Sequence, residues 1–454
     1  MSKVHPTPIN NNRIGFQYYP DTFHYRESDL IAWLPELVSL GAKWLVLDTP
    51  ADRAIPEDFI QPLISAGIEP ILNMHLPLSE PPTAESLSIL FDVYANWGVH
   101  YIYLFDRPNT LQAWSEESWV QQELVRRFLD TFIPLAELAC QTGLFPIFPA
   151  LEPGGNFWDT AFLRRALQGI WDRKHTRLLN HLVMGAYAWP GNHHLNWGAG
   201  GPKLWPTARP YTPPENEDQR GFRIFDWYTS ISEAILGTRL PIILLGTGTN
   251  SESQEGGQDQ QSYQSASTEI NFRIAKLLAG ETTAFQTPET PFPIPDHVLA
   301  GCFTPLVSLP SEPASHLSWY LPDGTVLPIV QKMKEWQTSR KQTLATQTQN
   351  LALLQEDLPS EEKTKKPIKH YMLLPHHEWG VASWYLEVGQ PYIQKYSPTI
   401  GFSMKEAFLA EKVTVVGGVH AYSDQLIHEL EKNGSTVIQI TGNGTDIATQ
   451  FTIK

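Results

Sequence analysis

The chain repeats one unit about eight times before residue 340: a short apolar run that ends in polar or aromatic residues, followed by a helical stretch. Between the first two runs, the amphipathic segment 28–40 closes on Gly41. The runs cover residues 14–20, 44–50, 70–75, 101–109, 145–152, 182–189, 241–248 and 298–307. Continuous apolar runs that alternate with helical patterns are typical of a parallel sheet buried on both faces. A (β/α)8 TIM barrel accounts for eight such units in one closed sheet.

A doubly wound open sheet would show the same alternation of strands and helices. It would need a second sheet to absorb eight strands, so the barrel is favoured. The length of 454 residues agrees with a barrel plus one smaller domain, because a barrel with long loops takes well over 250 residues.

The domain organisation is clearest near the end of the chain. We predict a barrel over 1–340, a charged linker over 341–369 that contains the break Glu361–Pro367, and a small α/β domain over 370–454. The expected parallel strands of the small domain are 371–374, 413–416 and 436–440, and the expected helices lie near 382–393, 404–410 and 423–433. The fold class is therefore α/β throughout.

The charge balance excludes some classes of partner. The chain has 33 basic and 48 acidic residues, a formal net charge of −15, and no concentration of Lys and Arg before residue 330. A nucleic-acid-binding face and contact with an anionic membrane both need such a concentration. Residues 1–13 lack the apolar core of a secretory signal, and no stretch is long and apolar enough to span a membrane, so we expect a soluble protein that is cytoplasmic by default.

Metal and cofactor signals are weak. Cys140 and Cys302 are the two cysteines, and they have no metal-ligand spacing. His193 and His194 are adjacent, so their side chains point in opposite directions, and no further ligand lies at a recognised spacing. We therefore predict no metal and no cofactor.

The strand endings carry a family resemblance. Their order, the long sixth loop running into 225–228 (FDWY), and the barrel end at 317–324 (LSWYLPDG) resemble the large retaining glycoside hydrolase clan built on the (β/α)8 barrel. In that clan, the fourth strand ends in a Trp-Asn-Glu-Pro type motif whose Glu is the general acid, and the seventh ends in a nucleophilic Glu. The chemistry needs two carboxyl groups about 5 Å apart on opposite sides of the glycosidic oxygen.

Neither of the clan's catalytic positions carries a carboxylate here. Aligned on its proline, the segment 105–109 (FDRPN) puts Asp106 at the family's Asn and Arg107 at the family's Glu. An arginine cannot donate a proton at neutral pH. On the seventh strand, Gly246 falls where the nucleophile is expected, and the nearest downstream acid, Glu252, lies in a stretch that is flexible by composition. The resemblance thus implies fold and ancestry more than activity.

The polar residues that end strands two to six are candidate site groups, because strand C-termini build the active site of a barrel. They are Asp48, His75, Asp106, Arg107, Glu152, Tyr187 and Trp189. Each has a structural alternative: Asp48 can cap the turn before Pro50, His75 can be a hydrogen-bonded structural histidine, and Arg107 can pair with a neighbouring carboxylate. Asp106 and Glu152 end adjacent strands, so they are also candidates for a relocated catalytic acid/base pair.

Aromatic content indicates a carbohydrate ligand. The chain has 15 Trp, and several fall in expected loops: Trp114, Trp119, Trp158, Trp189, Trp197 and Trp205. Sugar rings pack on indole, while their hydroxyls need planar polar partners such as Asn192. We therefore predict Asn192 and Trp197 as further substrate-binding residues. The alternative is that large loops use Trp as a small core of their own.

The C-terminal domain has a resemblance of its own. The segment 413–419 (VTVVGGV), the helix opening at Ser423 and the stretch 437–449 are similar to one repeat of bacterial cell-wall-binding domains. The repeat occurs once and lacks the family's Asp-Arg after the last Gly. Gly417 and Gly418 also suit a tight turn into a helix.

Two functions follow as hypotheses, both with an oligosaccharide or cell-wall glycan as partner. The first is a non-catalytic carbohydrate-binding protein on a degenerate glycosidase barrel. The second is an active glycan-processing enzyme that uses Asp106 and Glu152; a scaffold without a ligand is a third alternative. Carboxyl groups free of the arginine and facing an open cleft would favour the enzyme, whereas a closed network centred on Arg107 would favour binding or scaffolding.

Overall fold

The computed structural model describes residues 5–208, 216–250, 260–281, 291–309, 315–340, 342, 366–375, 383–417, 424–442 and 444–453. The chain divides into two compact units, residues 1–342 and 343–454, and each is described by itself. Most of the predicted linker, 341–369, lies outside the described residues, as do Glu252 and the segment 418–423.

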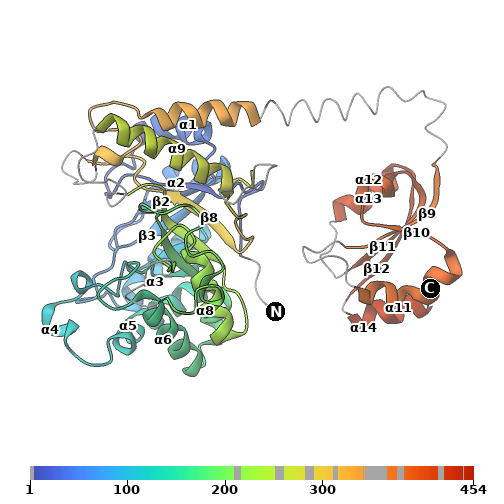
Figure 1. Cartoon of the computed structure of the whole chain (residues 1–454), viewed down its shortest axis with the longest axis horizontal. Helices are drawn as coiled ribbons and strands as arrows, with labels where there is room; N and C mark the ends of the chain where they lie inside the picture. Colours follow the sequence, from blue (N-terminus) through green and yellow to red (C-terminus); the bar gives the residue numbers. More distant parts are fainter. Residues whose placement is uncertain are drawn as a thin grey trace. The chain divides into compact units, whose positions relative to one another are not determined.

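The first unit contains a closed barrel of eight parallel strands in sequential order, which confirms the predicted fold class (Figure 1). The strands are β1 (Ile14–Gln17), β2 (Trp44–Asp48), β3 (Glu69–Asn73), β4 (Tyr101–Tyr103), β5 (Phe145–Phe148), β6 (Val183–Ala188), β7 (Ile242–Thr247) and β8 (Val298–Phe303). Each strand lies within one of the apolar runs of the sequence, except that β3 begins one residue before its run.

Helices alternate with the strands. They are α1 (Glu27–Leu40), α2 (Glu57–Ser65), α3 (Ala84–Asn96), α4 (Glu116–Trp119), α5 (Leu124–Thr142), α6 (Asp159–Asp172), α7 (Thr176–His181), α8 (Ile224–Leu236) and α9 (Gln260–Leu278), followed by a helical stretch over 328–340. Short 3-10 turns cover Leu111–Ala113, Gly201–Lys203 and Ser315–Leu317. Gly41 ends α1 as the sequence indicated, with a φ of 77° that glycine adopts without a steric penalty.

The barrel interior is filled by side chains. Trp44, Tyr101 and Phe145 pack against one another, with ring centroids 5.3 Å apart for Trp44 and Tyr101 and 5.8 Å for Tyr101 and Phe145. The hydroxyl of Tyr101 donates a hydrogen bond to the carbonyl oxygen of Pro6 in the N-terminal segment. A filled interior leaves the C-terminal mouth of the strands as the place for a ligand.

The second unit is a four-stranded parallel sheet in the order β10, β9, β11, β12. Its strands are β9 (Ile368–Leu373), β10 (Thr399–Gly401), β11 (Ala410–Gly417) and β12 (Thr436–Thr441), and its helices are α11 (Ser383–Tyr396), α12 (Met404–Phe408), α13 (Asp424–Lys432) and α14 (Gly444–Ile453). The three predicted strands and three predicted helices are confirmed. The sequence reading missed β10, which is only three residues long, and α14.

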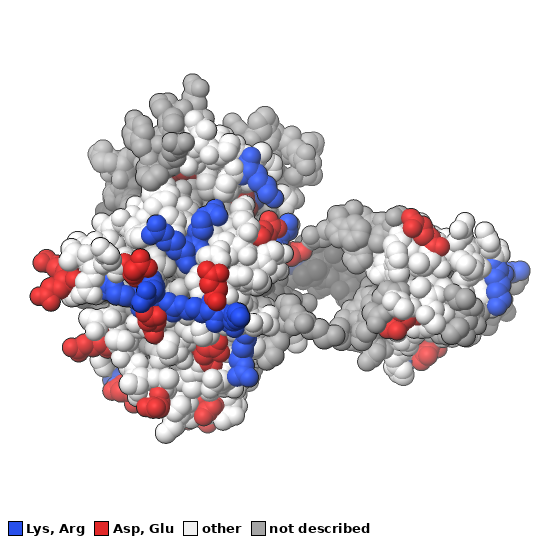
Figure 2. Space-filling view, turned by 90° about the horizontal axis from the view of Figure 1, so that it is seen from below, with Lys and Arg blue, Asp and Glu red and all other residues white. Residues whose placement is uncertain are grey.

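Two observations concern the surface and the membrane. On the face shown in Figure 2, several Lys and Arg side chains adjoin one another in a band across one unit, and Asp and Glu side chains flank this band. No helix among the described residues has the length and apolar character needed to cross a membrane.

Candidate functional site

A cavity of about 420 Å³ opens at the C-terminal mouth of the barrel. Its volume lies within the range of small-molecule sites. Six of the predicted site residues line it: His75, Asp106, Arg107, Glu152, Tyr187 and Trp189. The other lining residues include Gln17, Asn73, Tyr103, Asn250, Thr304 and Ser308, which the sequence reading did not single out. Gln17 and Asn73 end β1 and β3, so the same strand-end signal applied to both of them.

The carboxylate of Asp106 is held from three sides. Its Oδ1 accepts hydrogen bonds from the hydroxyls of Tyr103 at 2.7 Å and Tyr187 at 2.5 Å, and its Oδ2 lies 3.4 Å from Arg107 Nε. Burial and the nearby Asp106 charge raise the pKa of both tyrosines above the ordinary value. Both phenols therefore remain protonated hydrogen-bond donors at neutral pH.

Arg107 lies between two carboxylates. Its Nε is 3.4 Å from Asp106 Oδ2 and 3.4 Å from Glu152 Oε2, and its guanidinium carbon lies 4.6 Å from the ring centroid of Tyr187. Burial works against the charge, but Tyr187, Asp106 and Glu152 outweigh it and raise the pKa of Arg107. The result is a closed network centred on a permanently charged arginine.

Two residues at the mouth have an unfavourable backbone conformation. His75 follows β3 with φ 45°, and Arg107 follows β4 with φ 43°. Residues other than glycine in this left-handed region cost on the order of 1–3 kcal/mol each, and they concentrate at functional sites. The strain is a reason to regard these two strand ends as functional.

His75, Asp48 and Asn73 form a second polar group. His75 Nε2 lies 3.2 Å from Asp48 Oδ1, and the Asn73 amide nitrogen donates to the same oxygen at 2.9 Å. Burial lowers the pKa of His75, but Asp48 and Asp106 outweigh it, so the net shift is upward. Asp48 does not line the cavity and acts through His75 and Asn73. Asn73 is buried and lines the cavity, and its Oδ1 has no hydrogen-bond partner among the described residues.

An aromatic pair fills the space beside Gly246. Tyr187 and Trp189 of the sixth unit stack with centroids 4.5 Å apart and planes 10° apart, and Tyr187 is the direct cross-strand neighbour of Gly246. A Cβ atom on Gly246 would lie 2.7 Å from Tyr187 Cδ1 and 3.1 Å from Trp189 Nε1. The position expected for a seventh-strand carboxylate is thus sterically closed. Trp189 Nε1 is itself buried without a partner among the described residues.

Asn192 and Trp197 do not line the cavity. Trp197 stacks on His193 with centroids 3.9 Å apart, and its Nε1 donates to Asp218 Oδ1 at 3.1 Å. Asn192 is an exposed residue of the same loop. The structure therefore separates these two predicted binding residues from the other candidates, because Trp197 packs within its own loop.

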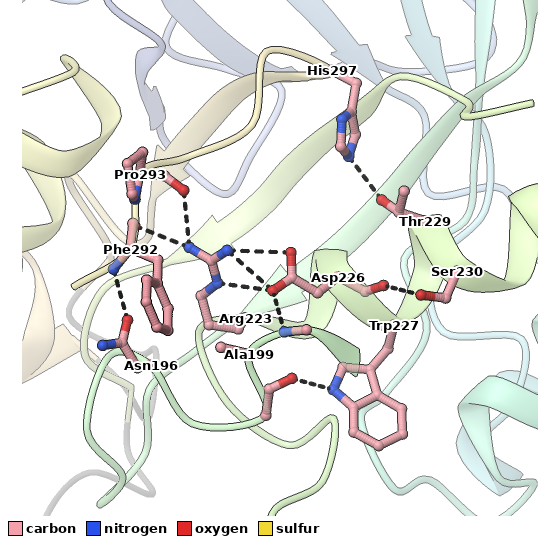
Figure 3. A network of polar contacts seen from close by, with 12 residues as sticks. Asn196, Ala199, Arg223, Asp226, Trp227, Thr229, Ser230, Phe292, Pro293 and His297 are labelled. Atoms are coloured by element: carbon pink, nitrogen blue, oxygen red, sulfur yellow. Dashed lines mark hydrogen bonds and ion pairs between the residues drawn. The ribbon is translucent and has the colours of Figure 1, made fainter. Parts of the chain in front are cut away.

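The sixth loop is anchored by a polar network around Arg223 (Figure 3). The guanidinium donates to both carboxylate oxygens of Asp226 and to the carbonyl oxygens of Phe292 and Pro293. Asn196 Oδ1 accepts from the Phe292 amide at 2.8 Å. These contacts tie the loop after β6 to the segment before β8, so asparagine in this loop has a structural use.

The described residues contain no group of three or more His, Cys, Asp and Glu side chains that could hold a metal ion. Cys140 and Cys302 are both buried, and burial raises the pKa of the Cys302 thiol. Both cysteines therefore belong to the packed part of the barrel.

Comparisons with known proteins show no family for this chain. No family model matches the chain, and no curated protein matches it. Among solved structures, the chain is similar to a monomeric β-xylosidase from Caulobacter crescentus, with 13% identity, coverage of 73% of this chain and 69% of that chain, and a TM-score of 0.44. A family 39 glycoside hydrolase from Bacteroides cellulosilyticus has 12% identity, coverage of 73% and 65%, and a TM-score of 0.43.

A different enzyme class also appears among these structures. A dihydropteroate synthase from Xanthomonas albilineans has 11% identity, coverage of 72% of this chain and 92% of that chain, and a TM-score of 0.32. The likeness concerns the fold alone. Any statement about function must come from the geometry of the mouth.

Proposed function

We propose that this protein binds a carbohydrate in the cavity at the barrel mouth and does not hydrolyse it. The cavity offers an aromatic pair, Tyr187 and Trp189, together with polar groups that suit hydroxyls. Asn73 Oδ1 and Trp189 Nε1 are buried polar atoms without a hydrogen-bond partner among the described residues, and both residues line the cavity. A sugar combines C–H faces with hydroxyls that both donate and accept, so it matches this combination.

The position of Arg107 carries the proposal. Hydrolysis of a glycosidic bond needs two carboxyl groups that face each other across the glycosidic oxygen. Here the guanidinium nitrogen of Arg107 lies at 3.4 Å from each of the two candidate carboxylates, Asp106 and Glu152. The space between them is therefore taken by a cation, and Gly246 supplies no replacement carboxylate on the seventh strand.

One observation favours the alternative of an active enzyme. Because both carboxylate oxygens lie 3.4 Å from one nitrogen, they are no more than twice that distance apart. Catalytic carboxyl groups of glycosidases are about 5–9.5 Å apart. This upper limit of 6.8 Å is compatible with the separation of about 5–5.5 Å in retaining enzymes, provided that a substrate displaces Arg107.

Calorimetric titration of the full-length protein with neutral oligosaccharides, run beside a hydrolysis screen with aryl glycosides, distinguishes the two functions. We expect saturable binding without turnover. Asp106→Asn and Glu152→Gln should weaken binding, whereas Glu57→Gln, an exposed carboxylate at the start of α2, should not. Turnover that both amide variants abolish would establish the enzyme instead. A protein that neither binds nor cleaves any sugar would refute the proposal.

A further inference from the structure

We propose that the ligand is an extended neutral oligosaccharide that runs from the mouth cavity, past His75 and Asp106, into a second cavity. This inference rests on the proposed function and names its ligand class. The second cavity measures about 430 Å³ and is lined by residues 76–79 after β3 and residues 112–115 after β4, together with His75 and Asp106.

The two cavities share two lining side chains. His75 and Asp106 line both of them. The His75 side chain is 48% exposed and the Asp106 side chain 26% exposed, so each presents polar atoms to a ligand. Asp106 is fixed by Tyr103 and Tyr187, and His75 is fixed by Asp48. A chain of sugar units that crosses from one cavity to the other would therefore place a linkage against two rigid polar groups.

Trp114 forms a rigid aromatic wall of the second cavity. Its Nε1 donates to the carbonyl oxygen of Pro108 at 2.8 Å, and the guanidinium of Arg127 lies 5.2 Å from its ring centroid. Arg127 is itself held by the Ser118 carbonyl oxygen at 2.6 Å. An indole that is fixed in this way loses little conformational entropy when a sugar ring packs on it.

The charges along both cavities favour a neutral glycan. Among the described residues that line the second cavity there is no Lys or Arg, whereas Gln112, Ser79 and Ser115 supply neutral hydrogen-bonding groups. In the first cavity, the one arginine among the lining residues already faces two carboxylates. A uronic acid polymer would bring further negative charge to an acidic site without a free cation to receive it.

The test is calorimetric titration with a size ladder of neutral gluco-, xylo- and manno-oligosaccharides, from monosaccharide to hexasaccharide. We expect the affinity of the wild type to rise with length in at least one series. Trp114→Ala should weaken binding of the long members about three- to tenfold, the loss of one aromatic contact, and leave the monosaccharide unaffected. Trp171→Ala, on α6 and 51% exposed, is the matched control and should change nothing.

Gln112→Ala keeps the test decisive if Trp114→Ala unfolds, because Gln112 is exposed and its removal leaves no buried gap. We expect Gln112→Ala, like Trp114→Ala, to weaken binding of the long oligosaccharides and not of the monosaccharide. Equal affinity at every length, with no effect of either variant, would overturn the extended site while the proposed function stands. Oligogalacturonates that bind as tightly as neutral sugars would overturn the neutral class. Absence of binding to any sugar would refute the proposed function itself.

Discussion

Replacement of Gly246 by alanine tests whether the aromatic pair of Tyr187 and Trp189 closes the position of the seventh-strand carboxylate. The added methyl carbon would lie 2.7 Å from Tyr187 Cδ1, whereas carbon atoms in contact are about 3.5–4.0 Å apart. Tyr187 cannot swing away freely, because its hydroxyl is bonded to Asp106 at 2.5 Å and its ring lies under Arg107. The substitution must therefore shift the network around Arg107.

Overpacking of this kind costs about 1–3 kcal/mol, and the lower backbone entropy of unfolded alanine offsets about 0.4–1 kcal/mol of it. The mid-range values, about 2 and about 0.7 kcal/mol, give an expected net loss of about 1.3 kcal/mol in the free energy of unfolding. Urea denaturation of the full-length protein, with the barrel transition analysed separately from that of the second unit, measures the loss. Calorimetry with the tightest oligosaccharide should show weaker binding in parallel, because the displaced rings belong to the cavity wall.

A double-mutant cycle with Tyr187→Ala supplies the control. Removal of the tyrosine ring abolishes the shortest contact of alanine at 246 and leaves only those with Trp189 at 3.1 Å. The combined variant should therefore be more stable than the sum of the two single losses predicts by about 0.5 kcal/mol or more. Additive losses would refute the steric argument. So would a Gly246→Ala variant whose stability lies within about 0.5 kcal/mol of the wild type and whose sugar affinity is unchanged.

Three further predictions concern charge and backbone strain. Arg107→Ala should lower the free energy of unfolding by about 1–3 kcal/mol, a value intermediate between those of exposed and buried ion pairs. Arg107→Gly should lower it by about 1 kcal/mol less, because glycine relieves the backbone strain at φ 43°. Equal losses of the two variants in urea denaturation would contradict this. By NMR, the pKa of the His75 imidazole should lie above its usual 6.5 in the wild type and should be lower in Asp48→Asn. The stability that this ion pair contributes is present at low pH and is lost as the pH rises through the raised pKa. An unchanged His75 pKa in the variant would exclude the pairing. Burial lowers the pKa of His5 to about 4; the unfolded chain therefore takes up the proton first, and stability should fall between about pH 6.5 and 4, less so in His5→Gln.

The sequence predicted the positions of the barrel strands because each strand is a local pattern. An apolar run such as 242–247 is buried on both faces whatever its neighbours are, so the run marks the strand. One short strand was missed for the same reason. Residues 399–401 form β10 with only three residues, two of them exposed, which is too short for a periodic pattern to be recognised.

The candidate site was predictable only in part. Six of the nine predicted residues line the mouth cavity, because strand C-termini converge in a barrel whatever the details of packing. Asp48 contacts His75 and does not line the cavity itself, while Trp197 and Asn192 lie away from the cavity. Loops are placed by tertiary contacts such as those of Arg223, which no local pattern records.

The amino-acid sequence by itself determined the eight-unit barrel and the second α/β unit. Only the tertiary structure decided that Arg107 stands between Asp106 and Glu152 and that Tyr187 fills the space beside Gly246. Strand identity follows from burial along one segment, whereas these contacts depend on cross-strand register and side-chain direction between segments far apart in the chain.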